Sequence, residues 1–302
     1  FTIIGSALYL NTGVSLDFET KASYQVAVTA DNGVAPSPDA TSATYTLNVT
    51  NVSPETLTGT DAADVLTGGT DIDLIFGLAG NDTLDSGVDT LADQLIGGNG
   101  NDTYLVRSAN DIVIENFAAV NATTNVDTVK AAISYGLSAN ANVEVLTTIS
   151  ASATTAINLT GNGLSQQITG NAGNNVIVGA GGRDILTGGL GADVFKFASI
   201  ADTGKTAATR DLITDFTHSS TLALSDRIDL SAIDANGALA GNAVFTFLST
   251  RGAQFTGKAG QLHYFASGSS TIIEGDINGD KVADFQIQLS GLKTLSASDF
   301  LL

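Results

Sequence analysis

The sequence predicts an all-β protein built around a parallel β-roll, a β-helix-like solenoid, over residues 56–196. A nine-residue pattern of glycine and aspartate recurs in register, and apolar residues recur at one fixed place within it. The composition agrees, with 33 glycines and only 14% charged residues. Glycine permits tight turns, and short apolar runs between turn residues are typical of strands. We therefore expect many short strands joined by glycine turns.

The clearest copy of the pattern is Gly-Gly-Asn-Gly-Asn-Asp-Thr-Tyr-Leu at residues 97–105, with aspartate at position six. Steps of nine, nine, eleven, nine and nine residues connect the aspartates of the first block, the longer step reflecting an insertion near Ser86. These aspartates are Asp64, Asp73, Asp82, Asp93, Asp102 and Asp111. A phase kept over six copies indicates a true repeat.

A second block keeps the same phase in steps of nine, with Gln166, Asn175, Asp184 and Asp193 at position six. Two residues after each position six stands an apolar residue that we expect to point inward. These residues are Leu66, Ile75, Leu84, Leu95, Tyr104, Val113, Ile168, Ile177, Leu186 and Phe195. Because Gln166 and Asn175 offer only amide oxygens, the second block is predicted to be the weaker set of metal sites.

If two repeats make one turn of the roll, Asp64, Asp82 and Asp102 line one edge. The other edge then carries Asp73, Asp93 and Asp111. Stacked carboxylates repel, and a net charge of −19 leaves little basic charge to relieve them. Calcium is the natural counter-ion because it takes six to eight oxygen ligands. We expect several Ca²⁺ ions, whose binding contributes folding free energy.

The predicted calcium loops comprise the aspartates named above together with their glycines and one asparagine. The additional residues are Gly68, Gly77, Gly80, Gly97, Gly98, Asn99, Gly100, Gly179, Gly181, Gly188 and Gly191.

The nonapeptide resembles the calcium-binding repeat of RTX proteins. Later segments extend the resemblance to RTX proteins of the serralysin type, namely 191–195 (GADVF), 211–216 (DLITDF), 226–230 (DRIDL), 260–264 (GQLHY), 275–285 and the ending 295–302 (LSASDFLL). The resemblance implies a calcium-loaded roll and a β-rich C-terminal capping domain at 197–302. It also implies export by type I secretion machinery, with folding on calcium outside the cell.

Residues 1–55 alternate as strands do, for example at 24–28 and 45–49. With the segments 16–19, 30–33 and 48–52 they resemble the second half of a cadherin-like repeat. That resemblance implies a partial β-sandwich with calcium at Asp17, Glu19 and Asp31. A sandwich edge with solvated acids is the alternative.

Between 115 and 160 the glycine pattern fades while β-prone runs persist, so we expect degenerate turns of the roll without calcium loops. Solvated or capping roles are expected for Asp226 and Asp229. His218 is expected in a loop and His263 on the surface of a strand.

The segment 276–284 has a second, EF-hand-like spacing of oxygen ligands. Asp276, Asn278, Asp280 and Asp284 occupy positions one, three, five and nine of such a loop, but Lys281 stands where that loop has glycine. An acidic hairpin turn at Asn278-Gly279 is the equal alternative.

Several function classes are excluded or disfavoured by the sequence. The chain has 31 acidic and 12 basic residues, which argues against nucleic-acid binding. No apolar run approaches the roughly 20 residues of a membrane span. No His-Glu-x-x-His, Gly-x-Ser-x-Gly or P-loop motif is present, so we expect no enzyme activity from these residues. The chain starts at Phe1 without methionine, and we expect it to be a fragment.

These observations predict the calcium-binding structural C-terminal region of a secreted RTX adhesin or cell-surface protein. Its expected partners are calcium, the type I secretion machinery and either copies of itself or a cell-surface ligand. Two alternatives stay open. One is the secretion and folding tail of an extracellular enzyme such as a protease, lipase or polysaccharide-modifying enzyme. The other is a self-assembling surface-layer or filament subunit.

Overall fold

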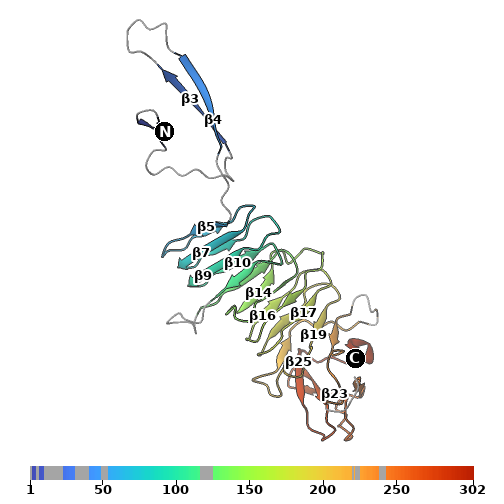
Figure 1. Cartoon of the computed structure of the whole chain (residues 1–302). Helices are drawn as coiled ribbons and strands as arrows, with labels where there is room; N and C mark the ends of the chain where they lie inside the picture. The colour runs from blue at the N-terminus through green and yellow to red at the C-terminus, as the bar shows by residue number, and fades with distance from the viewer. Residues whose placement is uncertain are drawn as a thin grey trace. The chain divides into compact units, whose positions relative to one another are not determined.

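The computed structural model describes residues 2–4, 7–9, 23–30, 41–48, 54–115, 125–219, 221, 225–237 and 243–302. The chain divides into two compact units, residues 1–55 and 56–302 (Figure 1). Asp17, Glu19 and Asp31, the predicted calcium ligands of the first unit, lie outside the described residues. In the described part of the chain, no helix is long and apolar enough to cross a membrane.

The first unit contains two antiparallel pairs of strands. The short pair is β1 (Thr2–Ile4) with β2 (Ala7–Tyr9), and the long pair is β3 (Ser23–Ala30) with β4 (Thr41–Asn48). In the long pair Tyr24 lies opposite Leu47 and Val26 lies opposite Tyr45, so apolar residues share one face. The two predicted strands are therefore confirmed.

The second unit is a roll in which successive strands alternate between two faces as far as β21. One face is a single sheet of twelve strands, in the order β22-β23-β24-β25-β20-β18-β16-β14-β12-β10-β8-β6. The other face consists of two sheets, β11-β9-β7-β5 and β13-β15-β17-β19-β21-β26. Neighbouring strands of the roll are parallel, for example Leu84 beside Tyr104 and Ile168 beside Leu186. The predicted parallel β-roll is confirmed.

The strands of the first half of the roll are β5 (Glu55–Thr58), β6 (Val65–Thr67), β7 (Asp73–Ala79), β8 (Thr83–Asp85), β9 (Gln94–Asn99), β10 (Thr103–Val106), β11 (Ile112–Ile114), β12 (Thr128–Ala131), β13 (Tyr135–Gly136) and β14 (Val145–Thr148). The remaining strands are β15 (Leu159–Thr160), β16 (Gln167–Thr169), β17 (Val176–Val178), β18 (Ile185–Thr187), β19 (Val194–Lys196), β20 (Asp211–Ile213), β21 (Arg227–Asp229), β22 (Thr246–Phe247), β23 (Gln261–Ser267), β24 (Ser270–Asp276), β25 (Phe285–Ser290) and β26 (Phe300–Leu301), the last preceded by the 3₁₀ helix η2 (Ala297–Asp299).

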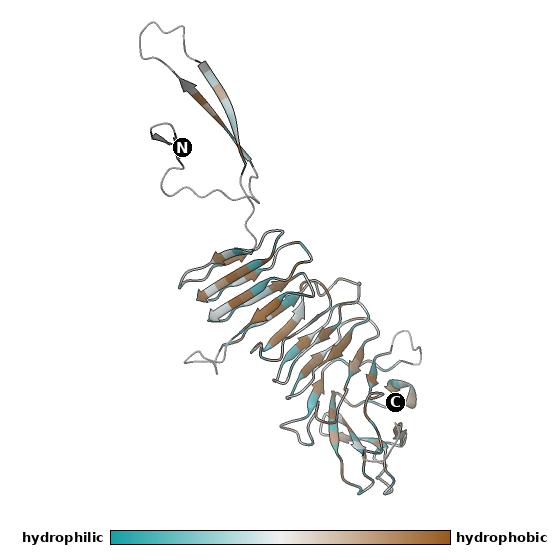
Figure 2. Ribbon diagram, viewed as in Figure 1, coloured by the Kyte–Doolittle hydropathy of each residue, from teal (hydrophilic) through white to brown (hydrophobic). Residues whose placement is uncertain are grey.

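The core of the roll is a column of apolar side chains between the two faces, as the repeat predicts. The residues two places after position six are 0–1% exposed from Ile75 to Phe195, and only Leu66 in the first turn is partly buried. Figure 2 shows hydrophobic residues running along the strands of the roll. The degenerate segment contributes to the same column through Val129, Leu146 and Leu159.

The two faces continue past residue 196 into the C-terminal region. Strand β20 adds to β18 and β21 adds to β19, both in parallel. Strands β25 and β26 then add to β20 and β21, again in parallel. Among the described strands of this region, β24 alone is reversed, and it pairs antiparallel with β25 and with β23. The C-terminal region is thus built directly onto the sheets of the roll.

Candidate metal sites along the edges of the roll

The acids predicted for one edge of the roll form a ladder of hydrogen bonds. The backbone N–H of Asp64 donates to Asp82 Oδ1 at 2.8 Å, and that of Asp82 donates to Asp102 Oδ1 at 2.8 Å. The ladder then runs on, because Asp102 N donates to Asp127 Oδ1 at 2.7 Å and Asp127 N to Glu144 Oε2 at 2.8 Å. The predicted edge is confirmed. The degenerate turns, for which no calcium loop was expected, also carry acids in this ladder, namely Asp127 and Glu144.

The opposite edge carries an equivalent ladder. Asp73 N donates to Asp93 Oδ1 at 2.8 Å, and Asp93 N donates to Asp111 Oδ1 at 3.3 Å. This edge therefore also carries the aspartates that the sequence assigns to it.

The second block has the same ladders and extends them past the last repeat. Bonds of 2.7–2.8 Å run from the position-six N–H groups to the next carboxylate on the same edge, in the pairs Gln166–Asp184, Asn175–Asp193, Asp184–Asp211 and Asp193–Asp226. Of the solvated or capping role expected for Asp226, the solvated alternative was wrong, because Asp226 is only 3% exposed and accepts the N–H group of Thr217 at 2.7 Å. Asp229 does cap, accepting the N–H of Ser231 at 3.0 Å.

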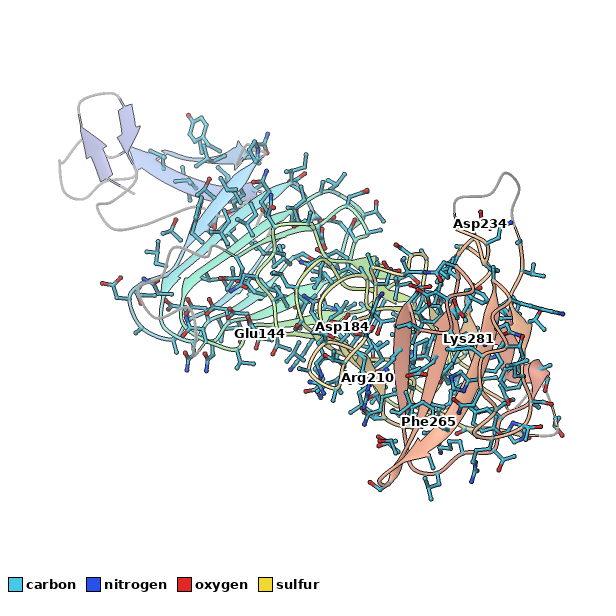
Figure 3. All side chains as sticks on the ribbon, turned by 90° about the horizontal axis from the view of Figure 1, so that it is seen from below. Glu144, Asp184, Arg210, Asp234, Phe265 and Lys281 are labelled. Atoms are coloured by element: carbon cyan, nitrogen blue, oxygen red, sulfur yellow. The ribbon has the colours of Figure 1, made fainter. Side chains whose placement is uncertain are left out.

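Four repeat loops leave the second carboxylate oxygen of their position-six aspartate buried, with no donor among the described residues. We call these four the open loops, and their aspartates are Asp82, Asp102, Asp184 and Asp193. Asp211, which follows the last repeat, also has an unpartnered buried Oδ2. Each side chain is 0–1% exposed. Figure 3 labels Asp184 among the side chains of the roll. In each open loop the residue four places earlier has a positive φ, namely Leu78 (82°), Gly98 (101°), Ala180 (65°) and Gly189 (103°).

The unpartnered oxygens of the open loops point at glycines. A Cβ added to Gly77 would lie 2.4 Å from Asp82 Oδ2 and 2.6 Å from the carbonyl oxygen of Gly97. Likewise a Cβ on Gly188 would lie 2.2 Å from Asp193 Oδ2. Glycine is thus required beside each carboxylate, and at Gly77 two hydrogen-bond acceptors converge on one space. A buried acceptor without a donor is costly, and a cation satisfies it.

Five other loops satisfy the same oxygen internally, and we call them the capped loops. There the N–H four residues earlier donates to the position-six side chain, in the pairs Thr60–Asp64 (2.6 Å), Gly69–Asp73 (2.7 Å), Arg107–Asp111 (3.0 Å), Asn162–Gln166 (3.1 Å) and Asn171–Asn175 (2.9 Å). None of these five donors is among the residues with positive φ in the described part of the chain.

The two amide residues, Asn175 and Gln166, also donate hydrogen bonds from their side-chain NH₂ groups. Asn175 Nδ2 donates to the carbonyl oxygen of Ile157 at 2.8 Å and to Asn171 Oδ1 at 2.9 Å. Gln166 Nε2 donates to Asn162 Oδ1 at 2.8 Å. The amide oxygens expected to face a metal instead accept backbone N–H groups, and an NH₂ group faces the neighbouring acceptors.

Burial raises the pKa of several ladder acids. Desolvation raises the pKa of Asp93, Asp184 and Asp193 to about 7 and that of Asp211 to about 8, and neighbouring carboxylates add to the increase. Desolvation also raises the pKa of Asp82 and Asp102. Hydrogen bonds from the ladder N–H groups oppose the shift without cancelling it. Acids of this kind release protons when a cation binds.

Residues 66–302 match the profile of the family described as Peptidase M10 serralysin C terminal. The chain belongs to this family. The resemblance inferred from the repeats and from the C-terminal motifs is thereby confirmed for the roll and for the region that follows it. Membership in the serralysin C-terminal family fits a calcium-binding region of a secreted protein.

Solved structures similar to the chain include two subunits of a mannuronan C5-epimerase from Azotobacter vinelandii. The AlgE6 R2 subunit is 30% identical over 48% of this chain and 80% of its own, with a TM-score of 0.34. The R3 subunit is 20% identical over 83% of this chain and 84% of its own, with a TM-score of 0.28.

A third similar structure is the extracellular lipase LipA from Serratia marcescens, which is 16% identical with a TM-score of 0.29. The match covers 84% of this chain and 41% of the lipase. No curated protein sequence matches the chain. Because all three TM-scores are low, the serralysin C-terminal profile alone carries the family assignment.

The remaining predicted glycines fall into two groups. Gly80, Gly98, Gly100 and Gly191 have φ between 101° and 141°, which side chains rarely adopt. In the other group, Gly68, Gly77, Gly97, Gly179 and Gly188, an added Cβ would lie 2.2–2.4 Å from a ladder carboxylate. Gly181 belongs to neither group, since its nearest neighbour would be Gly163 Cα at 3.6 Å. Asn99 contributes its carbonyl oxygen to the N–H of Gly80 at 2.8 Å.

The acidic segment 276–284 forms the turn between β24 and β25. Its side chains accept N–H groups of the turn itself, in the pairs Asp276–Gly279, Asp276–Lys281, Asn278–Asp280, Asp280–Val282 and Asp284–Ile277, at 2.7–3.0 Å. Lys281 has a φ of 72° where an EF-hand would have glycine. This geometry favours the hairpin turn over the EF-hand-like site.

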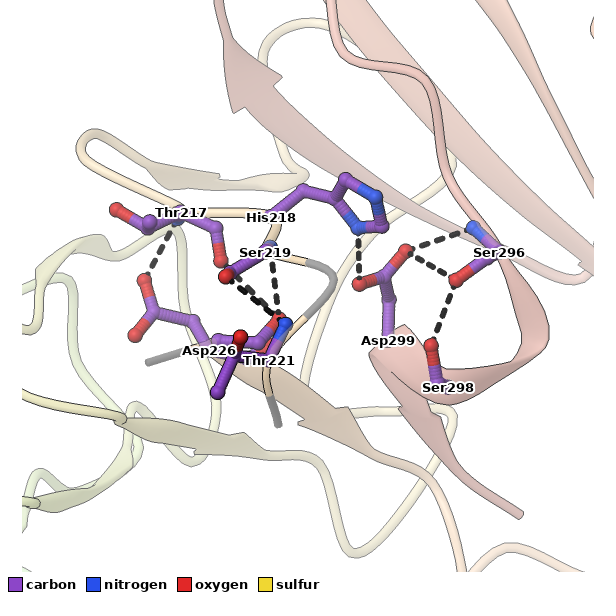
Figure 4. A network of polar contacts seen from close by, with 9 residues as sticks. Thr217, His218, Ser219, Thr221, Asp226, Ser296, Ser298 and Asp299 are labelled. Carbon is purple, nitrogen blue, oxygen red and sulfur yellow. Dashed lines mark hydrogen bonds and ion pairs between the residues drawn. The ribbon is translucent and has the colours of Figure 1, made fainter. Parts of the chain in front are cut away.

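Both histidines are paired with acids. His218 lies in a loop, as expected, and its Nδ1 is 2.7 Å from Asp299 Oδ1 in η2 (Figure 4). His263 lies on β23 with its Nε2 3.0 Å from Glu274 Oε2. It is only 4% exposed and packs against Phe255 and Phe265, so the expected surface position was wrong.

Proposed function

We propose that residues 56–302 form a calcium-dependent folding module of a secreted protein. The calcium ligands are the open-loop aspartates, whose unpartnered oxygens point at glycines. At Asp82 a backbone carbonyl oxygen faces the same space. Calcium bound there neutralises the ladder carboxylates and joins one turn of the roll to the next. The capped loops hold their turns by hydrogen bonds alone.

The observation that carries this proposal is the convergence of acceptors beside Gly77. Asp82 Oδ2 and the carbonyl oxygen of Gly97 approach the same space, and Asp82 Oδ2 has no donor among the described residues. Oxygen-only ligands favour a hard cation, and calcium tolerates the irregular geometry of backbone and carboxylate oxygens. Beside Gly179 and Gly188 an added Cβ would likewise lie 2.3 Å from the unpartnered oxygen of Asp184 and 2.2 Å from that of Asp193.

The test is a calcium titration of the whole chain followed by far-UV circular dichroism, starting in excess chelator. We expect the β signal to rise cooperatively, at roughly 10⁻⁴–10⁻³ M calcium by analogy with extracellular modules. Asp82→Asn keeps the shape of the side chain and removes a charge from an open loop, so it should shift the midpoint to higher calcium.

The matched control is Asp61→Asn, an exposed aspartate of the same block. It should leave the midpoint unchanged. A spectrum that is fully β in chelator and indifferent to calcium would remove the calcium-dependent folding from the proposal.

Calcium dependence also suits export. A chain whose acids repel in the absence of calcium stays extended in a calcium-poor cytosol and folds outside the cell. Type I secretion machinery is the proposed exporter. A passenger fused to residues 56–302 should reach the medium only when such an exporter is present, and its retention with the exporter present would contradict this step.

For the first unit we propose a cadherin-like role within an adhesin or cell-surface protein. The supporting observation is the β3–β4 pair with Tyr24, Val26 and Leu47 on one face, in a unit separate from the roll. Two strands alone are marginally stable, so this face is expected to pack within a larger sandwich. We further propose that residues 1–302 have no catalytic role. Atomic-force pulling of the whole chain with and without calcium tests the mechanical role expected of an adhesin.

The runner-up function is the folding tail of an extracellular peptidase, which the description of the serralysin C-terminal family favours. In that case the roll would also fold on binding calcium, and it would support the folding of a catalytic domain. Adding the separately expressed module to a denatured secreted peptidase and measuring recovered activity distinguishes this case from the adhesin.

A further inference from the structure

Three buried acids gather where the first block of repeats ends. One side-chain oxygen from each of Asp102, Glu115 and Asp127 lies within 4.8 Å of the others. The three residues are 1%, 5% and 2% exposed. The nine-residue pattern assigns a ligand role only to Asp102.

Glu115 stands where earlier turns of the roll have glycine. Ile114 of β11 is paired with Ile96 of β9. The next residue is Glu115 in one turn and Gly97 in the other, so these two residues occupy equivalent positions in neighbouring turns. A Cβ on Gly97 would lie 2.3 Å from Asp102 Oδ2 and 2.6 Å from Glu115 Oε1. The carboxylate of Glu115 therefore enters the space that beside Gly77 faces a backbone carbonyl.

A second, independent observation points to a ligand at this place. Asp102 Oδ2 is buried and has no hydrogen-bond partner among the described residues, and it points at this space. One oxygen of each of the other two acids has a donor. Glu115 Oε1 accepts the Tyr104 hydroxyl and, at 3.3 Å, the N–H of Gly98, and Asp127 Oδ1 accepts the N–H of Asp102 at 2.7 Å. The charges that act on Glu115 and Asp127 come from Asp102, Glu144 and each other, all of them acids.

We propose that Asp102, Glu115 and Asp127 together bind one divalent cation, calcium by its ligand chemistry, at a three-carboxylate site that closes the first block. The proposal rests on the proposed calcium-dependent roll and gives the open loop of Asp102 a ligand set that differs from those of the other open loops. Affinity for calcium rises with the number of charged ligands, so this ion binds more tightly than those of the open loops with a single carboxylate. It is the ion that chelator removes last.

The cluster borders a cavity on its Glu115 side. A cavity of about 290 Å³ adjoins Glu115 and is lined by Val113, Ile114, Ser138, Asn140 and Ala141. It lies where the second face of the roll is divided, between the sheet that ends at β11 and the sheet that begins at β13. Glu115 therefore borders both the acidic cluster and the cavity.

Native mass spectrometry of the whole chain in calcium counts the bound ions. Glu115→Gln preserves shape and removes one charge from the cluster, and it should lose one ion, the last to be released to chelator. Glu274→Gln is the matched control because Glu274 lies in β24 and pairs with His263. It should keep every ion.

The outcomes separate the two proposals. Binding of no calcium by the unaltered chain overturns the proposed function and this site together. Binding of several ions, all retained in Glu115→Gln, overturns only the three-carboxylate site and means that protons neutralise the cluster.

A second measurement covers the case in which Glu115→Gln does not fold. Terbium replaces calcium and emits when a nearby tyrosine is excited, and the Tyr104 hydroxyl contacts Glu115. Tyr104→Phe should weaken this sensitised emission, whereas Tyr24→Phe in the first unit should not. Equal emission from both variants overturns the proposed site.

Discussion

The open and capped loops share one nine-residue frame yet satisfy the same buried oxygen in different ways. At Asp184 and Asp193 the residue four places earlier, Ala180 or Gly189, has a positive φ and the carboxylate keeps an unpartnered oxygen. At Asn175 the N–H of Asn171 caps the side chain at 2.9 Å. A single backbone angle therefore accompanies the difference between a loop that needs a cation and one that does not.

This difference divides the second half of the roll into parts with separate requirements. The turns through Gln166 and Asn175 have a donor for each acceptor described above, and the next turns do not. The roll is therefore a calcium-dependent structure interrupted by a self-sufficient segment. The following measurements test this difference between the open and the capped loops.

Removal of calcium should have the largest effect. Each ion held at a concentration 100 times its Kd stabilises the folded chain by about 2.7 kcal/mol, and excess chelator removes this stabilisation from every site. Hydrogen exchange read by mass spectrometry should then show rapid exchange at β8, β10 and β18. The strands β15–β17 should keep their protection longest, and equal loss throughout would break the comparison.

In chelator the chain should lose stability as the pH rises. Asp184 and Asp193 have an ordinary pKa of 3.8 that burial raises to about 7 in the folded chain. Between these values the folded state holds protons that the unfolded state has released, so the stabilisation is complete below pH 3.8 and is lost as the pH passes 7. The far-UV circular dichroism of the chain in chelator at pH 5 and at pH 8 measures this loss.

Saturating calcium should abolish most of this pH dependence, because the bound ions displace the protons. A chain that is more stable at pH 8 than at pH 5 in chelator would contradict the burial of the ladder acids.

A methyl group placed in an open loop should cost on the order of 1–3 kcal/mol, the usual range for overpacking. The variant is Gly188→Ala, whose Cβ would lie 2.2 Å from Asp193 Oδ2. The matched control is Gly163→Ala, which would have nothing within 4 Å of its Cβ. Thermal unfolding in calcium compares the two, and equal melting temperatures would show that the space beside Gly188 is not needed.

Asn175→Asp should convert a capped loop toward an open one. It replaces the donor that reaches the carbonyl oxygen of Ile157 at 2.8 Å by an acceptor, at a cost of about 1–3 kcal/mol in chelator. Calcium should recover the loss and native mass spectrometry should count one additional ion. Asn158→Asp, at an exposed position, adds the same charge and should gain no ion.

The smallest expected effect concerns the backbone angle itself. Ala180 has a φ of 65° in an open loop, a conformation that glycine adopts at little cost. Ala180→Gly should therefore change stability in calcium by about 1 kcal/mol in the favourable direction. Asn171→Gly, in a capped loop, should destabilise instead. Denaturant midpoints of both variants in calcium test the assignment.

The parts of this architecture that depend on regular spacing were predictable from sequence. Asp64, Asp82 and Asp102 recur in phase, and that phase fixes both their common edge and the inward column after them. Asp127 and Asp211 were not predicted as members of the ladders, because the segments that precede them do not keep the nine-residue step of the repeats. Their one signal was the apolar residue two places later, Val129 and Ile213.

Other features depend on contacts that spacing does not encode. Leu78 and Ala180 adopt a positive φ that side chains rarely take, so nothing in their residue type predicted the open loops. His263 is buried because Phe255, from a separate segment, packs against it. Glu115 gave no repeat signal because it occupies a glycine position.

The ladders also have a direction. At every step the earlier turn supplies the N–H group and the later turn supplies the carboxylate, as from Asp64 to Asp82 and from Asp184 to Asp211. A turn is therefore completed only by chain that follows it in sequence. If the C-terminal end emerges first into a calcium-rich medium, each newly arriving turn docks on acceptors already in position. Assembly of the roll is then vectorial, from the C-terminal end toward the N-terminal end. Growth in the opposite direction leaves the ladder N–H groups of each newly added turn without their carboxylate acceptors.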